Sequence, residues 1–299
     1  MRPVFQDECD SCPWHDYCLS ELGEGVASVE ITDGRLDVRE WLSLSRQGVH
    51  TTAELSLVDI ADRAWTSNYL PEVTHQPQAL KRLGVAVQRA QMICDGITLR
   101  RTTEGQLEVP TADVEIDFDI EWDTDDRVYL WGALIRGAGK DGYIPFCSFE
   151  PMTEESELAL AQKFLDWLRG HVADAATEKR TVAVFHYSFP EPAHLKKILG
   201  EEVVADVLPH FVDLLPLMRN NFLGVHGLSI KKVAPVFGFA WRDEDPGGLQ
   251  SQLWLEQALS SDDHETAAQL RKRILDYNED DVRATAAIRD GLRNSGLSR

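Results

Sequence analysis

The chain has 299 residues, of which 43% are hydrophobic, and a formal net charge of −20 at neutral pH. This length favours two domains, and the hydrophobic content is sufficient for a buried core. The negative charge excludes broad, sequence-independent adhesion to nucleic acid, but it permits a local binding groove or an acidic site that holds its own metal. The sequence has no apolar run long enough to span a bilayer and does not begin as a signal peptide does. We therefore expect a cytoplasmic protein with no membrane partner.

Three of the five cysteines lie close together, with the spacing Cys9-x2-Cys12-x5-Cys18. In a cytoplasmic chain this spacing favours metal or iron–sulfur ligation over disulfide bonds. The further candidates for a fourth ligand are His15, Cys94 and Cys147. Three unrelated thiols are the alternative. Because no fourth cysteine is nearby, we expect the cluster to be incomplete, and labile or absent, in this chain.

A helical module is predicted to follow a cysteine-bearing arm. The arm spans residues 1–33 and contains a short strand at 26–33, and the module spans residues 34–110. Helices are predicted at 39–46, 53–64 and 77–92.

The segment 44–51 indicates a helical hairpin that turns at Gly48, a geometry that can present backbone N–H groups to a phosphate. Residues 38–101 contain eight basic and six acidic side chains, a local charge of +2. We expect sequence-independent phosphate contact from this module. A plain packing module is the alternative.

Residues Val114–Trp122 alternate acidic and apolar side chains, the period of a strand whose two faces differ. The acidic residues of this stretch are Glu115, Asp117, Asp119 and Glu121. On one face of a strand such carboxylates lie roughly 6–7 Å apart. A bound cation would relieve their repulsion. The alternative is an acidic strand face exposed to solvent.

Strands and then helices are predicted after this stretch. Further strands are expected at 127–136 and 142–149, joined by short turns into an antiparallel meander. A later strand is expected at 181–185, and a strand or a turn at 211–213. Helices are expected at 154–170, 192–199, 228–236, 249–259 and 263–293, the last broken near Asp276. This order predicts an α+β fold, in which a mixed α/β sheet is covered by helices.

Three motifs in this region resemble those of the DEDDy 3′–5′ exonucleases, which are DnaQ-like and have a ribonuclease-H-like fold. The first is Phe118-Asp119-Ile120-Glu121 and the third is Tyr277-x3-Asp281. The second, His186-Tyr-Ser-Phe-Pro-Glu191, resembles a motif that usually reads His-Asn-x-x-Phe-Asp. Glutamate therefore stands at position 191 where that family has aspartate.

The resemblance implies a centre of two Mg²⁺ or Mn²⁺ ions that hydrolyses phosphodiester bonds. Asp119 would bridge both ions, and Glu121, Glu191 and Asp281 would complete their coordination. Four carboxylates carry a formal charge of −4, which two divalent ions balance. Tyr277 would position the attacking water. The alternatives are Asp213 in place of Glu191, and Asp280 in place of Asp281.

The order of cysteines, helical hairpins and exonuclease-like domain resembles the RecB-like putative nucleases that end in a YprB-type ribonuclease-H-like domain. By that resemblance, residues 111–299 form the exonuclease domain and the chain is the C-terminal portion of a longer architecture. The implied substrate is DNA or RNA, with single-stranded ends. One alternative is a degenerate module that binds nucleic-acid ends without cutting, and another is a zinc-binding interaction scaffold. The sequence leaves the oligomeric state open.

Overall fold

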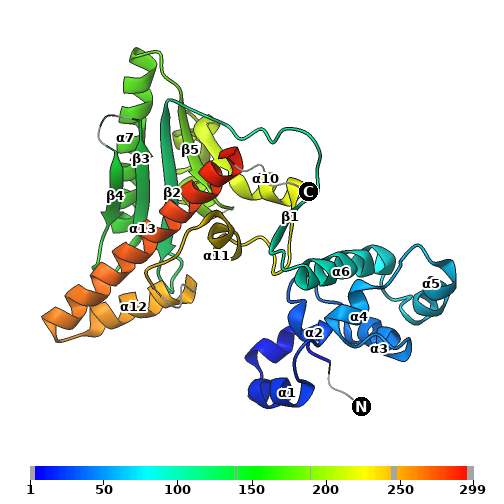
Figure 1. The fold of residues 1–299 in the computed structure, drawn as a ribbon. Helices are drawn as coiled ribbons and strands as arrows, with labels where there is room; N and C mark the ends of the chain where they lie inside the picture. Colours follow the sequence, from blue (N-terminus) through cyan, green and yellow to red (C-terminus); the bar gives the residue numbers. More distant parts are fainter. Residues whose placement is uncertain (1–3, 138, 140, 189, 244–247, 295–299) are drawn as a thin grey trace. The chain divides into compact units, whose positions relative to one another are not determined.

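The computed structural model describes residues 4–137, 139, 141–188, 190–243 and 248–294 (Figure 1). These residues form two compact units. The first comprises the described residues up to Thr103 together with Asn221–Lys232, and the second comprises Glu104–Asn220 and the residues from Val233 onward. The sequence pattern places a border at residues 110–111 and gives no sign that 221–232 would join the first unit. None of the described helices is both long enough and apolar enough to cross a bilayer.

The first unit is built mainly from short helices. They are η1 Asp7–Ser11, α1 His15–Leu22, α2 Ala27–Glu30, α3 Val38–Arg46, α4 Thr52–Ser56, α5 Arg63–Tyr69, η2 Leu70–Glu72 and α6 Ala79–Cys94. Buried residues from these helices and their links, among them Ile31, Trp41, Leu55, Tyr69 and Leu83, pack into one hydrophobic core. The predicted strand at 26–33 is wrong, because this segment contains α2 and only the single bridge between Val26 and Thr51.

At the segment 44–51, where two helices joined by a glycine turn were predicted, α3 ends at Arg46, the chain turns at Gly48 and α4 begins at Thr52. Gly48 turns the chain with a φ of 81°, a conformation that glycine adopts at little cost. The side chain of Thr51 then caps α4 by accepting a hydrogen bond from the backbone of Glu54. The predicted helix 53–64 is wrong, because α4 ends at Ser56. Asp62 instead caps the start of α5, in agreement with the preference of aspartate for helix starts over helix interiors.

A two-stranded antiparallel sheet completes the first unit. It pairs β1, Leu99–Arg101, with β7, Phe222–Gly224. The buried guanidinium of Arg89 on α6 donates to the Gly224 carbonyl and to Asp33. Arg89 therefore ties the 221–232 segment to the helical module.

The second unit contains a five-stranded mixed sheet with the order β4-β3-β2-β5-β6. The strands are β2 Val114–Trp122, β3 Val128–Arg136, β4 Gly142–Cys147, β5 Val182–His186 and β6 Phe211–Asp213. β2, β3 and β4 form the predicted antiparallel meander, and β5 and β6 add to it in parallel. The α/β mixed sheet is confirmed.

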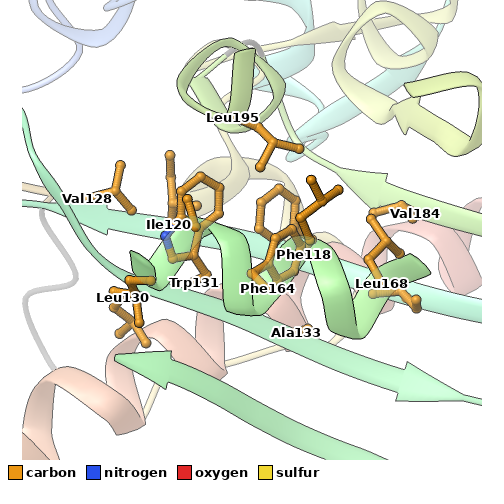
Figure 2. Packing of buried hydrophobic residues seen from close by; sticks show 14 of the residues in the cluster. Phe118, Ile120, Val128, Leu130, Trp131, Ala133, Phe164, Leu168, Val184 and Leu195 are labelled. Atoms are coloured by element: carbon orange, nitrogen blue, oxygen red, sulfur yellow. The ribbon is translucent and has the colours of Figure 1, made fainter. Parts of the chain in front are cut away.

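Helices lie on both faces of this sheet. The second unit contains α7 Glu154–Thr177, α8 Pro190–Leu199, α9 Glu201–Val204, η3 Leu208–His210, α10 Leu214–Asn221, η4 Ala234–Phe237, α12 Gly248–Ser260 and α13 His264–Asn294. The short helix α11, Ile230–Val233, falls almost entirely within the 221–232 segment of the first unit. Figures 1 and 2 show α7 on one face and α13 on the other. α13 is continuous through Asp276, so the predicted break there is wrong.

The apolar face of β2 packs against α7 (Figure 2). Phe118 of β2 stacks on Phe164 of α7 with ring centroids 4.7 Å apart, and Trp131 of β3 stacks on the same ring at 5.3 Å. This packing fixes which face of β2 carries the acidic residues. That face meets α13 instead of solvent, and Asp117 on it is fully buried. The alternative of a solvated acidic face is therefore wrong.

Candidate metal centre

Three carboxylates converge where β2 meets α13. Asp119 and Glu121 come from the same face of β2, and Asp281 comes from the side of α13 that lies over that face. One oxygen from each of the three side chains lies within 4.8 Å of the others. Glu121 and Asp281 are buried, and Asp119 is half-buried. Three carboxylates at this separation repel one another strongly unless a cation lies between them.

Asn278, next to the predicted Tyr277, positions Asp119. Its amide nitrogen donates to Oδ2 of Asp119 at 2.9 Å, and its amide oxygen accepts from the Tyr143 hydroxyl at 2.8 Å. Gly132 lies opposite Asp119 on β3, and a Cβ there would come within 1.6 Å of the Asn278 oxygen. The absence of a side chain at Gly132 therefore leaves the space that Asn278 occupies.

Two further neutral groups donate to the other carboxylates. The hydroxyl of Ser251 on α12, which is 1% exposed, donates to Oε2 of Glu121 at 2.6 Å. The indole N–H of Trp241 donates to Oδ1 of Asp281 at 2.7 Å. Sequence reasoning missed Trp241, Ser251 and Asn278. Asn278 lay within a recognised motif. Trp241 and Ser251 lay in none, and they are 40 and 130 residues from their partners in the sequence.

Tyr277 lies one helical turn before Asp281 and is 3% exposed. Burial raises its pKa well above the usual value, and the charges of Asp281, Glu121 and Asp119 raise it further, as does a hydrogen bond with Asp281. The phenol therefore stays protonated at neutral pH and keeps a proton to donate. Tyr277 and Asp281 lie on the same helix face, as predicted.

The predicted ligand Glu191 lies outside the group of three. It sits near the start of α8 with 4% exposure, and its Oε2 has no hydrogen-bond partner among the described residues. This oxygen is 3.6 Å from Nδ1 of His186 at the end of β5. Burial opposes the charged imidazole, but the neighbouring Glu191 and Asp213 carboxylates outweigh it and raise the pKa of His186.

The two alternative ligands have other partners. Asp213 accepts hydrogen bonds from the backbone N–H groups of Ser188 and Leu215, at 3.0 and 2.9 Å. Asp280 accepts from both the backbone and the guanidinium of Arg242. Within the described part of the chain, neither belongs to the group of three carboxylates.

The N-terminal half of the acidic strand face is built differently. Asp117 contacts the fully buried guanidinium of Arg289 on α13, which also lies 3.3 Å from Glu115. Arg293 lies 2.6 Å from Glu115, and Arg136 of β3 lies 3.7 Å from Asp117. Arginines from α13 and β3 therefore lie against these two carboxylates, and they oppose the burial that raises the pKa of Asp117.

The three clustered cysteines lie in the first unit, all free and partly exposed. Cys9 lies in η1, and its sulfur accepts a hydrogen bond from the backbone of Gln6. Cys12 follows η1, and Cys18 lies in α1. Nδ1 of His15 donates to Oδ1 of Asp16 at 2.9 Å. Iron–sulfur ligation by these residues stays a prediction.

The second unit is thus a mixed sheet with carboxylates on its central strand β2 and on the long helix α13 that lies over it. The family model RNase_H_2, described as RNase_H superfamily, matches residues 116–293, more than half of the chain. The chain therefore belongs to the RNase H superfamily. The searches of curated proteins and of solved structures each return no match.

Proposed function

We propose that the chain is a metal-dependent 3′–5′ exonuclease of the DEDDy type that hydrolyses phosphodiester bonds in DNA or RNA. The observation that carries this proposal is the group of Asp119, Glu121 and Asp281, which has Tyr277 at its edge. The exonuclease class and its polarity rest on the motif resemblance.

The donor set fits hard divalent cations such as Mg²⁺ and Mn²⁺, which prefer carboxylate oxygens. Asp119, Glu121 and Asp281 would hold them. Glu191, which has a buried oxygen without a hydrogen-bond partner among the described residues, is the proposed fourth carboxylate. Two such ions supply charge neutralisation on the phosphate and activation of water. They would also relieve the repulsion among the acidic side chains.

The protein's own groups would orient the reacting atoms. Asn278 and Ser251 hold Asp119 and Glu121 by hydrogen bonds, so these carboxylates are fixed before the substrate arrives. The protonated hydroxyl of Tyr277 would hold the attacking water in line with the scissile bond, which is a positioning role. His186 and Glu191 would line the side of the site formed by β5 and α8.

A degenerate end-binding module is the second candidate function. The observation that favours it is Glu191 in place of the usual aspartate, since the longer side chain lies against His186 and outside the group of three. Such a protein would bind metal and nucleic-acid ends without turnover.

The first unit is proposed to serve the same substrate. Its helical hairpin would add sequence-independent phosphate contacts, and Cys9, Cys12 and Cys18 would be part of an iron–sulfur site. The zinc-binding scaffold is the alternative for the cysteines. Metal analysis and visible absorbance distinguish iron–sulfur from zinc.

Oligonucleotides labelled at the 5′ or the 3′ end, single-stranded or duplex, test the activity in Mg²⁺, Mn²⁺ or EDTA. A 3′–5′ exonuclease shortens 5′-labelled strands stepwise and releases the 3′ label as a mononucleotide, only with metal. Asp119→Asn is the matched control, because any cutting that survives it comes from another site or a contaminant. Metal-dependent binding of ends by the wild-type chain without cutting would support the degenerate module.

A further inference from the structure

Three consecutive side chains, Trp241, Arg242 and Asp243, each contact α13. Trp241 donates to Asp281 at 2.7 Å. Arg242 forms ion pairs with Asp276, Glu279 and Asp280, and Asp243 accepts two hydrogen bonds from Arg273. We call residues 237–243 the strap.

The strap is also packed at its other end. Phe237 lies against Gly291 of α13 so closely that a Cβ on that glycine would come within 2.1 Å of the ring. Phe239 meets the Trp241 ring edge-on, with centroids 4.9 Å apart. The residues of α13 that the strap contacts extend from Arg273 to Gly291, which is roughly 27 Å of helix at 1.5 Å per residue. Contacts along this length fix where the indole of Trp241 lies.

The strap places a neutral donor, the indole N–H of Trp241, at the metal site. Its one guanidinium, that of Arg242, is directed to other carboxylates. The Arg242 guanidinium forms ion pairs with Asp276, Glu279 and Asp280. The neighbouring indole carries no charge, so it can hold one oxygen of Asp281 without competing with a divalent ion for the site. A carboxylate fixed by a hydrogen bond has less rotational freedom to lose when a metal binds.

We infer that Trp241 is a positioning residue, which orients Asp281 for metal binding through its indole N–H. This inference deepens the proposed function and rests on the metal centre described above. Groups that hydrogen-bond to metal ligands typically contribute about 10–100-fold in metal affinity. The alternative is that Trp241 only packs against α13.

Calorimetric titration with Mn²⁺ on the full chain tests the inference, with folding verified by circular dichroism at the temperature of titration. Trp241→Phe keeps an aromatic ring and removes the donor, so we expect Mn²⁺ affinity to fall about 10–100-fold. Trp167→Phe makes the same chemical change on α7, where the ring packs against Phe146 and Phe164. This control should keep wild-type affinity.

A second variant separates the N–H group from ring packing. Trp241→3-benzothienylalanine retains the bicyclic shape and replaces the N–H with sulfur. We expect it to bind Mn²⁺ as weakly as Trp241→Phe. Wild-type affinity in either Trp241 variant would overturn the inference, and so would an equal loss in Trp167→Phe.

The titration does not depend on turnover, so its result is separate from that of the nuclease assay. A wild-type chain that binds Mn²⁺ but does not cut would contradict the exonuclease proposal and leave the role of Trp241 standing. Full Mn²⁺ binding by the Trp241 variants in an active enzyme would contradict only the inference. A wild-type chain that binds no Mn²⁺ would overturn both.

Discussion

The two halves of the acidic face of β2 differ in what surrounds their carboxylates. Glu115 and Asp117 lie against the guanidinium groups of Arg136, Arg289 and Arg293. Asp119 and Glu121, on the same face and only two and four residues after Asp117, receive hydrogen bonds from the neutral groups of Asn278 and Ser251. One strand face therefore contains an ionic cluster and, beside it, a candidate cation site.

The difference teaches that an acidic strand pattern does not by itself define a function. Arginines already balance the first pair, which gives it a structural role in holding α13 on the sheet. Neutral donors orient the second pair and leave its negative charge in place, as a site for divalent cations requires. The neighbours contributed by α13 and α12 decide between the two roles.

The largest expected effect is that of Asp119→Asn, which removes a charge from the second pair and keeps the side-chain shape. Loss of this ligand should remove several kcal/mol of transition-state stabilisation, so turnover should fall by about 10³-fold or more. Mn²⁺ binding should be lost as well. Glu115→Gln is the same change on the structural pair and should leave the Mn²⁺ affinity of the folded protein unchanged. Turnover and calorimetry on both variants measure this. An Asp119→Asn protein that still cuts would end the proposed mechanism.

Removing an arginine that contacts the first pair, Glu115 and Asp117, should lower the stability of the fold. Arg289→Met leaves Asp117 buried without its closest cation, so we expect the free energy of unfolding to fall by about 3–5 kcal/mol. Adding Asp117→Leu removes the buried carboxylate that has lost its closest partner and should recover much of this loss. Urea unfolding in EDTA provides the measurement. A double variant no more stable than Arg289→Met would show that the charge of Asp117 is not the cause.

Tyr277→Phe separates positioning from metal binding. The hydroxyl is proposed to hold the attacking water, so its loss should lower turnover by about 10²–10³-fold, comparable to the loss of one preorganised donor. Mn²⁺ binding should survive, because the carboxylates are untouched, and its affinity should fall by no more than the about 10–100-fold expected for the lost hydrogen bond to Asp281. If Mn²⁺ binding disappears together with turnover, Tyr277 supports the site structurally and does not position water.

The smallest of these effects is metal-dependent stabilisation. Mn²⁺ at 100 times its dissociation constant should raise the free energy of unfolding by about 2.7 kcal/mol, because the ion binds the folded state. Glu121→Gln should lose this increment, whereas Glu115→Gln should keep it. Thermal unfolding with and without Mn²⁺ measures the difference. An equal increment in both variants would mean that the ion binds elsewhere.

The strand and helix pattern was accessible from the sequence because it depends on local periodicity. Alternation over Val114–Trp122 predicted β2 with its observed bounds, and the short links predicted the meander. Local pattern failed at 53–64, where the apolar spacing favoured a single helix but Asp62 begins a new one. It also failed at 26–33, where too few residues were available to separate a strand from one helical turn.

The candidate site could be predicted only in part from the sequence. Asp119, Glu121, Tyr277 and Asp281 lie in short motifs, so the sequence could group them. The placement of α13 over the acidic face could not be predicted, because it depends on packing between residues about 160 positions apart. Trp241 and Ser251 were missed for the same reason. The arginine partners of Glu115 and Asp117 were missed as well, although these arginines give that half of the acidic face its structural role.

α13 carries both halves of the comparison on one uninterrupted helix, with Asp281 eight residues before Arg289. At 1.5 Å per residue this interval covers about 12 Å, which matches the roughly 13 Å along β2 between Asp117 and Glu121. Inserting or deleting one residue between Asp281 and Arg289 would turn one end of the helix by about 100° relative to the other. Either the guanidinium or the carboxylate would then face away from β2. In the evolution of this chain, the interval should therefore accept almost no change of length.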